Sequence, residues 1–370
     1  MEHSMLFIPH DILFFILIRL HVKSLLRFQS VSKAWKAIIC DKIFKKTHHD
    51  QSKVSNPQKL LLVQLDDGVF EFRDLKNPQI AIRKQKFPLK RFQQVPALCS
   101  CDGLVLLKSH TAYKSYVLWN PYTNDYRIFK CEYVKAYSCT TPHACGFCYD
   151  SSADDYKVIL IYKSFYAVCY VSYENKWMKR TSVHVQELNA RSWECSQGIS
   201  IEGRVFWSIE WKINHLVRQI SKIIYFDVKS DEVKELQKPD FIGENDQLYR
   251  LTSLKGYVGL YGGKIHSKTF NIWIMEQDEW KLLMKISCNV VCERFVENSV
   301  LLGCMNHNEI LFQIQMGIGP QYFVIYDLER HQFVKQIQIS KDSRHYTVPI
   351  CSESLYFPKP NIKRKRKHLS

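Results

Sequence analysis

The sequence predicts an α+β protein of two domains, in which a short module of three helices precedes a large all-β domain of propeller-like repeats. Three observations favour this architecture. Apolar residues follow helical spacing in the first forty residues, a strand pattern then returns about every 50 residues, and aromatic residues make up 13% of the chain. Flat aromatic rings pack well on pleated sheets. At 370 residues the chain is long enough for both domains.

Composition and charge exclude several classes of protein. Hydrophobic residues make up 46% of the chain, which excludes global disorder. The apolar run at 12–18 is too short to span a bilayer, so we expect no membrane segment and no export signal. The 13 cysteines form no regular framework and no Asn-x-Ser/Thr sequon occurs, which favours the cytoplasm, the nucleus or both. The net charge of +16 favours acidic partners without naming one.

Three helices are expected near the start of the chain. The first begins at Pro9, a residue that suits a first helical turn. The second begins after Ser24, which is a good N-cap, and the third surrounds Trp35. The apolar residues at helical spacing are Ile12, Leu13, Ile16, Leu17 and Leu20 in the first helix, Leu25, Leu26, Phe28 and Val31 in the second, and Ala34, Ile38 and Ile39 in the third.

The first helix carries more apolar surface than one buried face requires. Phe14, Phe15 and Ile18 add a second apolar face to it. A module of about forty residues cannot bury every face of its own helices, and an exposed apolar patch on a small unit is typical of a docking surface. The alternative, that these helices only pack on the large domain, fits the periodicity equally well.

The same stretch resembles an F-box, over Ile8 to Leu13 (IPHDIL), Ile16 to Phe28 (ILIRLHVKSLLRF) and Ser30 to Trp35 (SVSKAW). The F-box pattern has a Leu-Pro pair, an acidic residue, a Leu/Ile helix, a Pro-Val-Lys-Ser-Leu turn and a Val-Cys-Lys-x-Trp close. The sequence departs from this pattern by having Ile8 for the usual Leu, Phe15 for an acidic residue, His21 for the turn Pro and Ser32 for Cys. Loss of the turn proline is expected to loosen the connection between the first two helices.

The resemblance implies a partner, the Skp-type adaptor of a cullin-RING ubiquitin ligase, which an F-box binds by laying apolar helix faces against it. Trp35 is expected to be an internal core anchor of the module. The residues that the resemblance assigns to the adaptor contact and its support are Pro9, Ile12, Leu13, Ile16, Leu17, Leu20, Val22, Leu25, Leu26 and Val31.

The domain boundary is placed in residues 46–58, which are polar and include Pro57. The predicted organisation is a helical module at 1–48, a linker at 49–58, a propeller-like domain at 59–358 and a basic tail at 359–370. The Lys/Arg run in the tail is typical either of a nuclear import signal or of a solvated chain end.

A repeat of about 50 residues runs through the large domain. A short apolar strand, a polar turn and an aromatic or branched residue recur, and the copies align at Asn120, Ser172, Asp227, Met275 and Asp327. A second strand series keeps the same period, and the segment Leu61 to Phe72 is a plausible earlier copy. A period near 50 with several strands per copy is typical of a propeller blade, so we expect five or six blades.

These repeats resemble the plant F-box-associated domain of type 1, including its S-locus-like members. The resemblance is carried by Cys101 to Leu104, Leu118 to Pro121, Gly146 to Asp150, Asp154 to Val158 and Ile272 to Met275. The paired glycines of kelch blades are not repeated, since Gly262-Gly263 is the one such pair. The repeat length of the domain is therefore similar to that of kelch blades, whereas the kelch glycine motif is not repeated.

No pattern of residues in the sequence indicates catalysis, a cofactor or a metal. Cys145 and Cys148 form a C-x-x-C, but one pair does not supply the four ligands of a closed zinc site. Asp150, Asp154 and Asp155 lack the glycine and closing glutamate of a calcium loop, so we expect them in turns. Phosphate-binding, nucleophile-elbow and zinc-protease motifs are absent from the sequence.

We therefore expect a non-catalytic receptor subunit of a ubiquitin ligase, which holds a target protein near a charged conjugating enzyme. Specificity is expected in loops, which are 131–141, 184–194, 211–221 and 243–250, and the candidate target contacts are Tyr133, Tyr137, Trp193, Trp211 and Tyr249. Two alternatives stay open: a basic nucleic-acid-associated protein, and a propeller enzyme with an unmarked central site.

Overall fold

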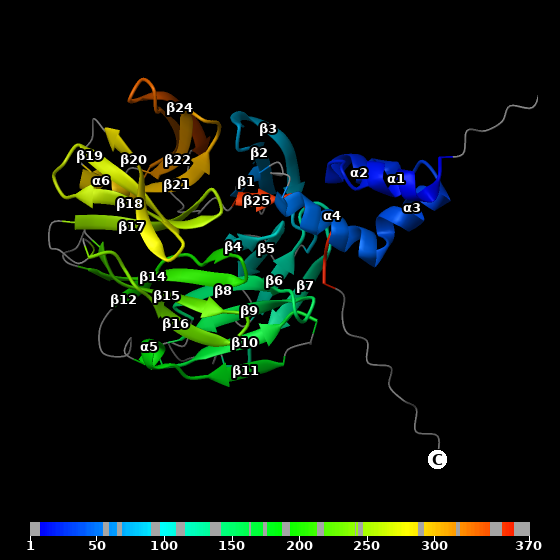
Figure 1. Cartoon of the computed structure of the whole chain (residues 1–370), viewed down its shortest axis with the longest axis horizontal. Helices are drawn as coiled ribbons and strands as arrows, with labels where there is room; N and C mark the ends of the chain where they lie inside the picture. Colours follow the sequence, from blue (N-terminus) through cyan, green and yellow to red (C-terminus); the bar gives the residue numbers. More distant parts are fainter. Residues whose placement is uncertain are drawn as a thin grey trace, which may run out of the picture.

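The computed structural model describes residues 8–54, 59–64, 69–89, 97–108, 115–133, 142–162, 164–172, 176–186, 193–212, 218–240, 242, 247–287, 292–315, 319–340 and 350–358. Helices open the chain, and six β-sheets arranged in a ring follow them (Figure 1). The predicted fold class, N-terminal helices followed by an all-β propeller, is confirmed, and the number of blades is six.

The helical module contains one helix more than the sequence analysis expected. Its helices are α1 (His10–Leu17), α2 (Val22–Phe28), α3 (Lys33–Cys40) and α4 (Lys42–Val54). Ser32 caps α3 by accepting a hydrogen bond from the Trp35 amide at 3.1 Å, and Asp41 does the same for α4 through the Ile43 amide at 2.8 Å. Helix α4 extends to Val54 and so covers much of the polar segment in which the domain boundary was placed.

The start of the second helix differs from the prediction. Ser24 lies inside α2 and is not its N-cap, because the helix already begins at Val22. The residue at the N-cap position is His21, whose side chain makes no capping hydrogen bond. The Val22 amide instead donates to a carboxylate from the far end of the chain, Glu353, at 2.9 Å.

Each sheet is an antiparallel blade of four strands, except the fourth, which has five. The first three blades are β25 (Ile350–Ser352), β1 (Lys59–Gln64), β2 (Val69–Asp74) and β3 (Asn77–Lys86); β4 (Ala97–Cys101), β5 (Leu104–Lys108), β6 (Ser115–Trp119) and β7 (Tyr126–Lys130); and β8 (Ala144–Asp150), β9 (Asp155–Ile161), β10 (Tyr166–Tyr170) and β11 (Trp177–Arg180).

The last three blades follow the same order along the chain. They are β12 (Trp193–Cys195), β13 (Ile199–Ile201), β14 (Arg204–Lys212), β15 (Arg218–Asp227) and β16 (Glu232–Leu236); β17 (Gln247–Leu254), β18 (Tyr257–Lys264), β19 (Thr269–Glu276) and β20 (Glu279–Ser287); and β21 (Ser299–Cys304), β22 (Glu309–Gln315), β23 (Gln321–Asp327) and β24 (Gln332–Ser340). Two short helices, α5 (Val183–Gln186) and α6 (Cys292–Asn298), lie between blades.

The ring closes by combining strands from the two ends of the β-domain. Strand β25 pairs with β1, with Cys351 opposite Leu60 and Ile350 opposite Leu61. The first blade is therefore complete only when residues 350–352 have joined it (Figure 1). Closure of this kind removes the exposed strand edge that β1 would otherwise present.

The second strand series seen in the sequence corresponds to a repeated hairpin turn. In three blades a hairpin turn is made of two residues that both have positive φ: Asp102 and Gly103 between β4 and β5, Glu202 and Gly203 between β13 and β14, and Lys255 and Gly256 between β17 and β18. Positive φ at both central positions is the signature of a type I′ turn, whose twist matches that of the flanking strands.

Apolar clusters fill the spaces between neighbouring blades. Trp119 is fully buried between the first and second blades, and Trp177 packs between the second and third. Trp273 and Trp280 pack at the edge of a cluster between the fourth and fifth blades. The tryptophans that recur with the repeat thus pack between sheets.

Candidate functional site

The first helix of the module exposes a large apolar face. The exposed fractions are 52% for Ile12, 60% for Phe15 and 47% for Ile16, and Val31 after α2 is 59% exposed. These side chains are too large and too exposed to belong to the core of the module. The described part of the chain thus leaves apolar helix surface uncovered, which is the feature expected of a docking surface.

The residues predicted for the adaptor contact divide into two groups in the structure. Pro9, Ile12, Ile16 and Val31 are exposed, whereas Leu20 and Leu26 are half-buried. The other four, Leu13, Leu17, Val22 and Leu25, are buried in the core of the module with Ile38, Ile39 and Phe44. The first group can touch a partner directly, and the buried group can act only by supporting the helices.

Trp35 packs inside the module. Its ring meets Phe28 edge to face with centroids 5.3 Å apart, a geometry that aromatic pairs prefer. The side chain holds the third helix against the second, as the sequence analysis expected.

The module docks on one end of the propeller through charged contacts from α4. The ammonium groups of Lys42 and Lys46 lie 2.9 and 3.2 Å from the carboxylate of Asp154, in the hairpin turn between β8 and β9. Burial alone would raise the pKa of Asp154, but hydrogen bonds from Tyr149, Lys42 and Lys46 outweigh it and lower the pKa to about 2. The Asp154 carboxyl is therefore ionised at neutral pH and able to bind both lysines.

A buried histidine adds a second contact between module and propeller. His49 of α4 is 3% exposed, and its Nε2 lies 3.6 Å from a carboxylate oxygen of Asp102 in the β4–β5 turn. Its ring also packs on Tyr356 with centroids 5.7 Å apart. Both turns, at Asp102 and Asp154, join the first and second strands of their blades, so the module sits on that end of the propeller.

The loops predicted to carry specificity belong to the opposite end. In an antiparallel blade, the first-to-second and third-to-fourth strand turns lie at one end, and all other connections lie at the other. The segments 131–141, 184–194 and 243–250 join successive blades, and 211–221 joins β14 to β15. The described strand ends that flank these four loops therefore face away from the helical module.

The five candidate target contacts are not brought together as one surface. Tyr133 is half-buried, and its ring packs on Phe165 with centroids 5.8 Å apart. Tyr249 is 4% exposed and lies in the core between the fourth and fifth blades. Trp193 and Trp211 face each other in the backbone register of β12 and β14. The side chains of these two tryptophans, and all of Tyr137, lie outside the described residues.

Sequence reasoning missed two groups of residues near these surfaces. Phe165 extends the aromatic surface of Tyr133 and carries the ammonium of Lys179 4.4 Å above its ring. Its position directly before β10 could have marked it, because aromatic residues beside loops are frequent binding anchors. The second group, Glu353 to Tyr356, gave no local signal.

The strands of the ring line a central cavity of about 1530 Å³, whose walls carry both polar and apolar side chains. A buried ion pair joins Arg250 Nη1 to Glu210 Oε2 at 2.6 Å, and the Ser208 hydroxyl donates to the other Glu210 oxygen at 2.9 Å. Burial alone would lower the pKa of Arg250, but the Glu210 carboxylate outweighs burial and raises it. The opposite charges of Arg250 and Glu210 therefore neutralise one another at the wall of the cavity.

The C-x-x-C pair does not form a common site. Residues three apart on a strand point to opposite faces of the sheet. Accordingly, Cys145 packs toward the second blade and Cys148 toward the fourth. Burial raises the pKa of Cys145 to about 12, so its thiol stays protonated. Within the described ranges, no group of three or more His, Cys, Asp or Glu side chains is arranged to hold a metal ion.

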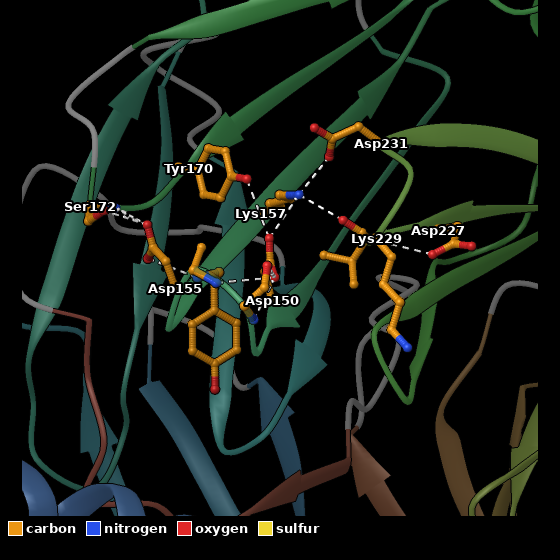
Figure 2. A network of polar contacts seen from close by, with 12 residues as sticks. Asp150, Asp155, Lys157, Tyr170, Ser172, Asp227, Lys229 and Asp231 are labelled. Carbon is orange, nitrogen blue, oxygen red and sulfur yellow. Dashed lines mark hydrogen bonds and ion pairs between the residues drawn. The ribbon is translucent and has the colours of Figure 1, made fainter.

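The clustered aspartates hold turns and bind a buried lysine (Figure 2). Asp150 accepts hydrogen bonds from the Ser152 backbone amide and hydroxyl at 3.0 and 2.6 Å, as expected of a turn residue. Lys157, which is 2% exposed, lies 2.9 Å from Asp150 and 2.7 Å from Asp231, and it donates to the Val228 carbonyl at 2.8 Å. This network joins the third blade to the fourth.

Two protein families match the two parts of the chain. The F-box domain family matches residues 5–47, and the family described as F-box associated beta propeller domain matches residues 28–359. No helix among the described residues is long and apolar enough to cross a membrane.

Similar proteins come from Arabidopsis thaliana. F-box protein At3g07870 is 26% identical, with 73% of this chain and 69% of that protein covered. F-box/kelch-repeat protein At3g23880 is also 26% identical, with 75% and 79% covered. A further protein, At3g16210, is 35% identical over a shorter stretch that covers 41% of this chain and 40% of that protein.

Proposed function

This chain belongs to the F-box proteins that carry an F-box associated beta propeller domain, and we propose that it is the target-binding receptor subunit of a Skp-cullin-F-box ubiquitin ligase. In this proposal the helical module binds the Skp-type adaptor, and the adaptor connects it to the cullin and its conjugating enzyme. The propeller holds the target protein.

The proposed mechanism is proximity. The receptor itself breaks and forms no covalent bond. Holding target lysines near a charged conjugating enzyme replaces a bimolecular encounter by an effectively intramolecular one, which raises the local concentration of the reacting groups. We place the protein in the cytoplasm, the nucleus or both.

The exposed apolar face of α1 supports the adaptor assignment most directly. Fully burying one large apolar side chain is worth about 1.5–3 kcal/mol, and Ile12, Phe15, Ile16 and Val31 are each about half exposed in the free module. Association costs on the order of 4–15 kcal/mol, so several of these side chains must be covered at once. Such a surface fits a partner that offers an apolar groove for a helix.

We propose that the target binds at the end of the propeller away from the module. At the near end the contacts of α4 already cover the turns at Asp102 and Asp154. The described strand ends at the far end of the propeller point away from the module. Tyr133 lies within the predicted specificity loop 131–141, and Phe165 packs on its ring, so both are candidate aromatic anchors for the target.

A binding experiment with the Skp-type adaptor tests the proposal. The double variant Ile12→Asp/Ile16→Asp places two charges on the exposed face, whereas Leu25→Ala would disturb the module core because Leu25 is fully buried. We expect the double variant to lose adaptor binding by at least about a hundredfold and to keep the thermal stability of the wild type, since two apolar contacts of roughly 1.5 kcal/mol each are removed.

The matched control is Leu282→Asp on β20, where the side chain is 51% exposed and far from the module in sequence. This variant should bind the adaptor like the wild type. Equal adaptor binding by the wild type and the double variant would contradict the proposal. Nucleic-acid binding that weakens with salt and requires residues 363–367 would favour the basic-protein alternative instead.

A further inference from the structure

Residues 353–356, which we name the C-terminal clasp, run between the helical module and the propeller. They follow directly after β25, the strand that closes the ring. All four side chains are buried, with exposed fractions of 6% for Glu353, 0% for Ser354 and Leu355, and 5% for Tyr356. A segment near a chain end is normally exposed unless it is held by specific contacts.

The clasp belongs to the core of the module. Leu355 packs in the apolar cluster formed by α1 to α4. The Glu353 carboxylate receives the Val22 amide at 2.9 Å and His21 Nδ1 at 2.5 Å, one on each oxygen. Glu353 thereby supplies the acceptor and the negative charge that the first turn of α2 lacks in its own sequence.

The clasp is equally fixed to the propeller. The fully buried side-chain amide of Asn120 donates to the carbonyls of Ser354 and Tyr356, at 3.0 and 3.1 Å. The Tyr356 hydroxyl donates to the Asp154 carbonyl at 3.1 Å. These contacts hold the clasp against the turn after β6 in the second blade and the turn between β8 and β9 in the third.

His21 is the position at which this chain departs from the proline of the F-box turn. Its φ is −61°, a value that proline also adopts. Proline has no side-chain donor, whereas the His21 imidazole reaches the clasp through Glu353. The chain therefore replaces a stiff local turn by a contact that spans the joint between module and propeller.

We propose that the clasp fixes the angle between the helical module and the propeller, with Glu353 and His21 as positioning residues. The inference rests on the proposed function: the adaptor is held at one end and the target at the other, so the angle determines which lysines come near the conjugating enzyme. A loosened clasp leaves both binding surfaces intact and changes the set of lysines that receive ubiquitin.

The test uses the full chain reconstituted with the adaptor, the cullin-RING complex and a conjugating enzyme. The variants are Glu353→Ala, Glu353→Gln and His21→Pro, and the matched control is Glu279→Ala, which removes an exposed carboxylate from β20. Two quantities are measured: hydrogen exchange at the Val22 amide, and the pattern of ubiquitin on the lysines of the propeller itself, mapped by mass spectrometry.

For Glu353→Ala we expect exchange at Val22 to accelerate about tenfold, because a hydrogen bond to a charged acceptor is lost, and the ubiquitin pattern to spread over more lysines. Glu353→Gln keeps an acceptor for the Val22 amide and should restore much of the wild-type exchange. His21→Pro should spread ubiquitin over more lysines, while the Val22 amide keeps its wild-type protection from hydrogen exchange. Adaptor affinity should be unchanged in all four variants.

The outcomes separate the two proposals. Absence of adaptor binding by the wild type overturns the ligase-receptor function, whereas the exchange data still report on the clasp. Normal adaptor binding with wild-type exchange and a wild-type ubiquitin pattern in both Glu353→Ala and His21→Pro overturns the clasp. If Glu353→Ala does not fold, His21→Pro decides alone, because the His21 side chain is 69% exposed and its removal leaves the core intact.

Discussion

Single residues hold the blades of this propeller together where apolar packing alone does not suffice. Lys157 is the clearest case: its ammonium is almost fully buried, yet two carboxylates and a carbonyl surround it (Figure 2). The partners come from both the third blade and the turn that follows β15. A buried charge is tolerated only when it is paired and hydrogen-bonded in this way.

Removal of Lys157 should therefore destabilise the propeller. In Lys157→Met the carboxylates of Asp150 and Asp231 lose their shared cation, and we expect the free energy of unfolding to fall by about 3–5 kcal/mol. The matched control is Lys234→Met, whose ammonium is 38% exposed and pairs with Asp227; it should cost less than about 1 kcal/mol. Denaturant unfolding measures the loss of stability in both variants, and an equal loss would contradict the proposed role of Lys157 in joining the blades.

At the scale of elements, the repeated hairpin turn has different surroundings in different blades. Gly103 and Gly256 occupy equivalent positions with φ of +84° and +87°. A Cβ atom at Gly103 would lie 2.6 Å from the Ser352 carbonyl oxygen and from Ser354 Cβ, whereas a Cβ at Gly256 would meet nothing within 4 Å. The two glycines thus share a backbone requirement and differ in packing.

This pair allows backbone strain to be separated from the contact with the clasp. Both Gly103→Ala and Gly256→Ala should lower the free energy of unfolding by about 1–2 kcal/mol, since each forces a side chain into the left-handed region of backbone conformation. Gly103→Ala should lose more, and only this variant should expose residues 353–356 to proteolysis. Thermal unfolding and limited digestion measure the two effects. The same digestion pattern in both variants would show that the turn at Gly103 does not support the clasp.

The elements also show what a sequence can and cannot predict. Blades repeat a local pattern, so the aligned positions from Asn120 to Asp327 predicted the propeller correctly. Helix α4 was missed because its polar residues, such as Lys45 and Gln51, give a weak apolar pattern, although Phe44 is fully buried. The apolar excess on α1 predicted an exposed face, but of the three residues to which it was assigned only Phe15 is exposed, because Ile18 is buried and Phe14 packs on Phe44. By contrast, the contact of Val22 with Glu353 joins residues 331 positions apart and leaves no trace in either neighbourhood.

At the scale of the whole molecule, the C-terminal residues add a second connection between the module and the propeller, beside the contacts of α4. Residues 350–352 complete the first blade, and residues 353–356 enter the module core. Helix α4 leads from the module to the propeller, so the chain passes this joint at both ends of the β-domain (Figure 1). The same short segment thus closes the ring of blades and holds the helical module in position.

Two truncations should separate this link from the basic tail. A chain that stops at residue 349 lacks β25 and the clasp, and we expect an open first blade, a lower melting temperature and a protease-sensitive module. A chain that stops at residue 358 keeps both and should unfold and bind the adaptor like the longer chain. Scanning calorimetry and limited digestion compare the two. Wild-type stability of the shorter truncation product would contradict the role of β25.

The pairing of β25 with β1 also sets an order of events during protein synthesis. Nearly the whole propeller leaves the ribosome after β1 and before β25, so β1 must wait for its partner with an unpaired edge of Leu and Val residues. Such an edge is a site of aggregation for a nascent chain. Chaperone dependence in the cell is therefore expected to last until residues 350–352 have left the ribosome. Messages with a premature stop codon before residue 350 should yield chains that are quickly degraded.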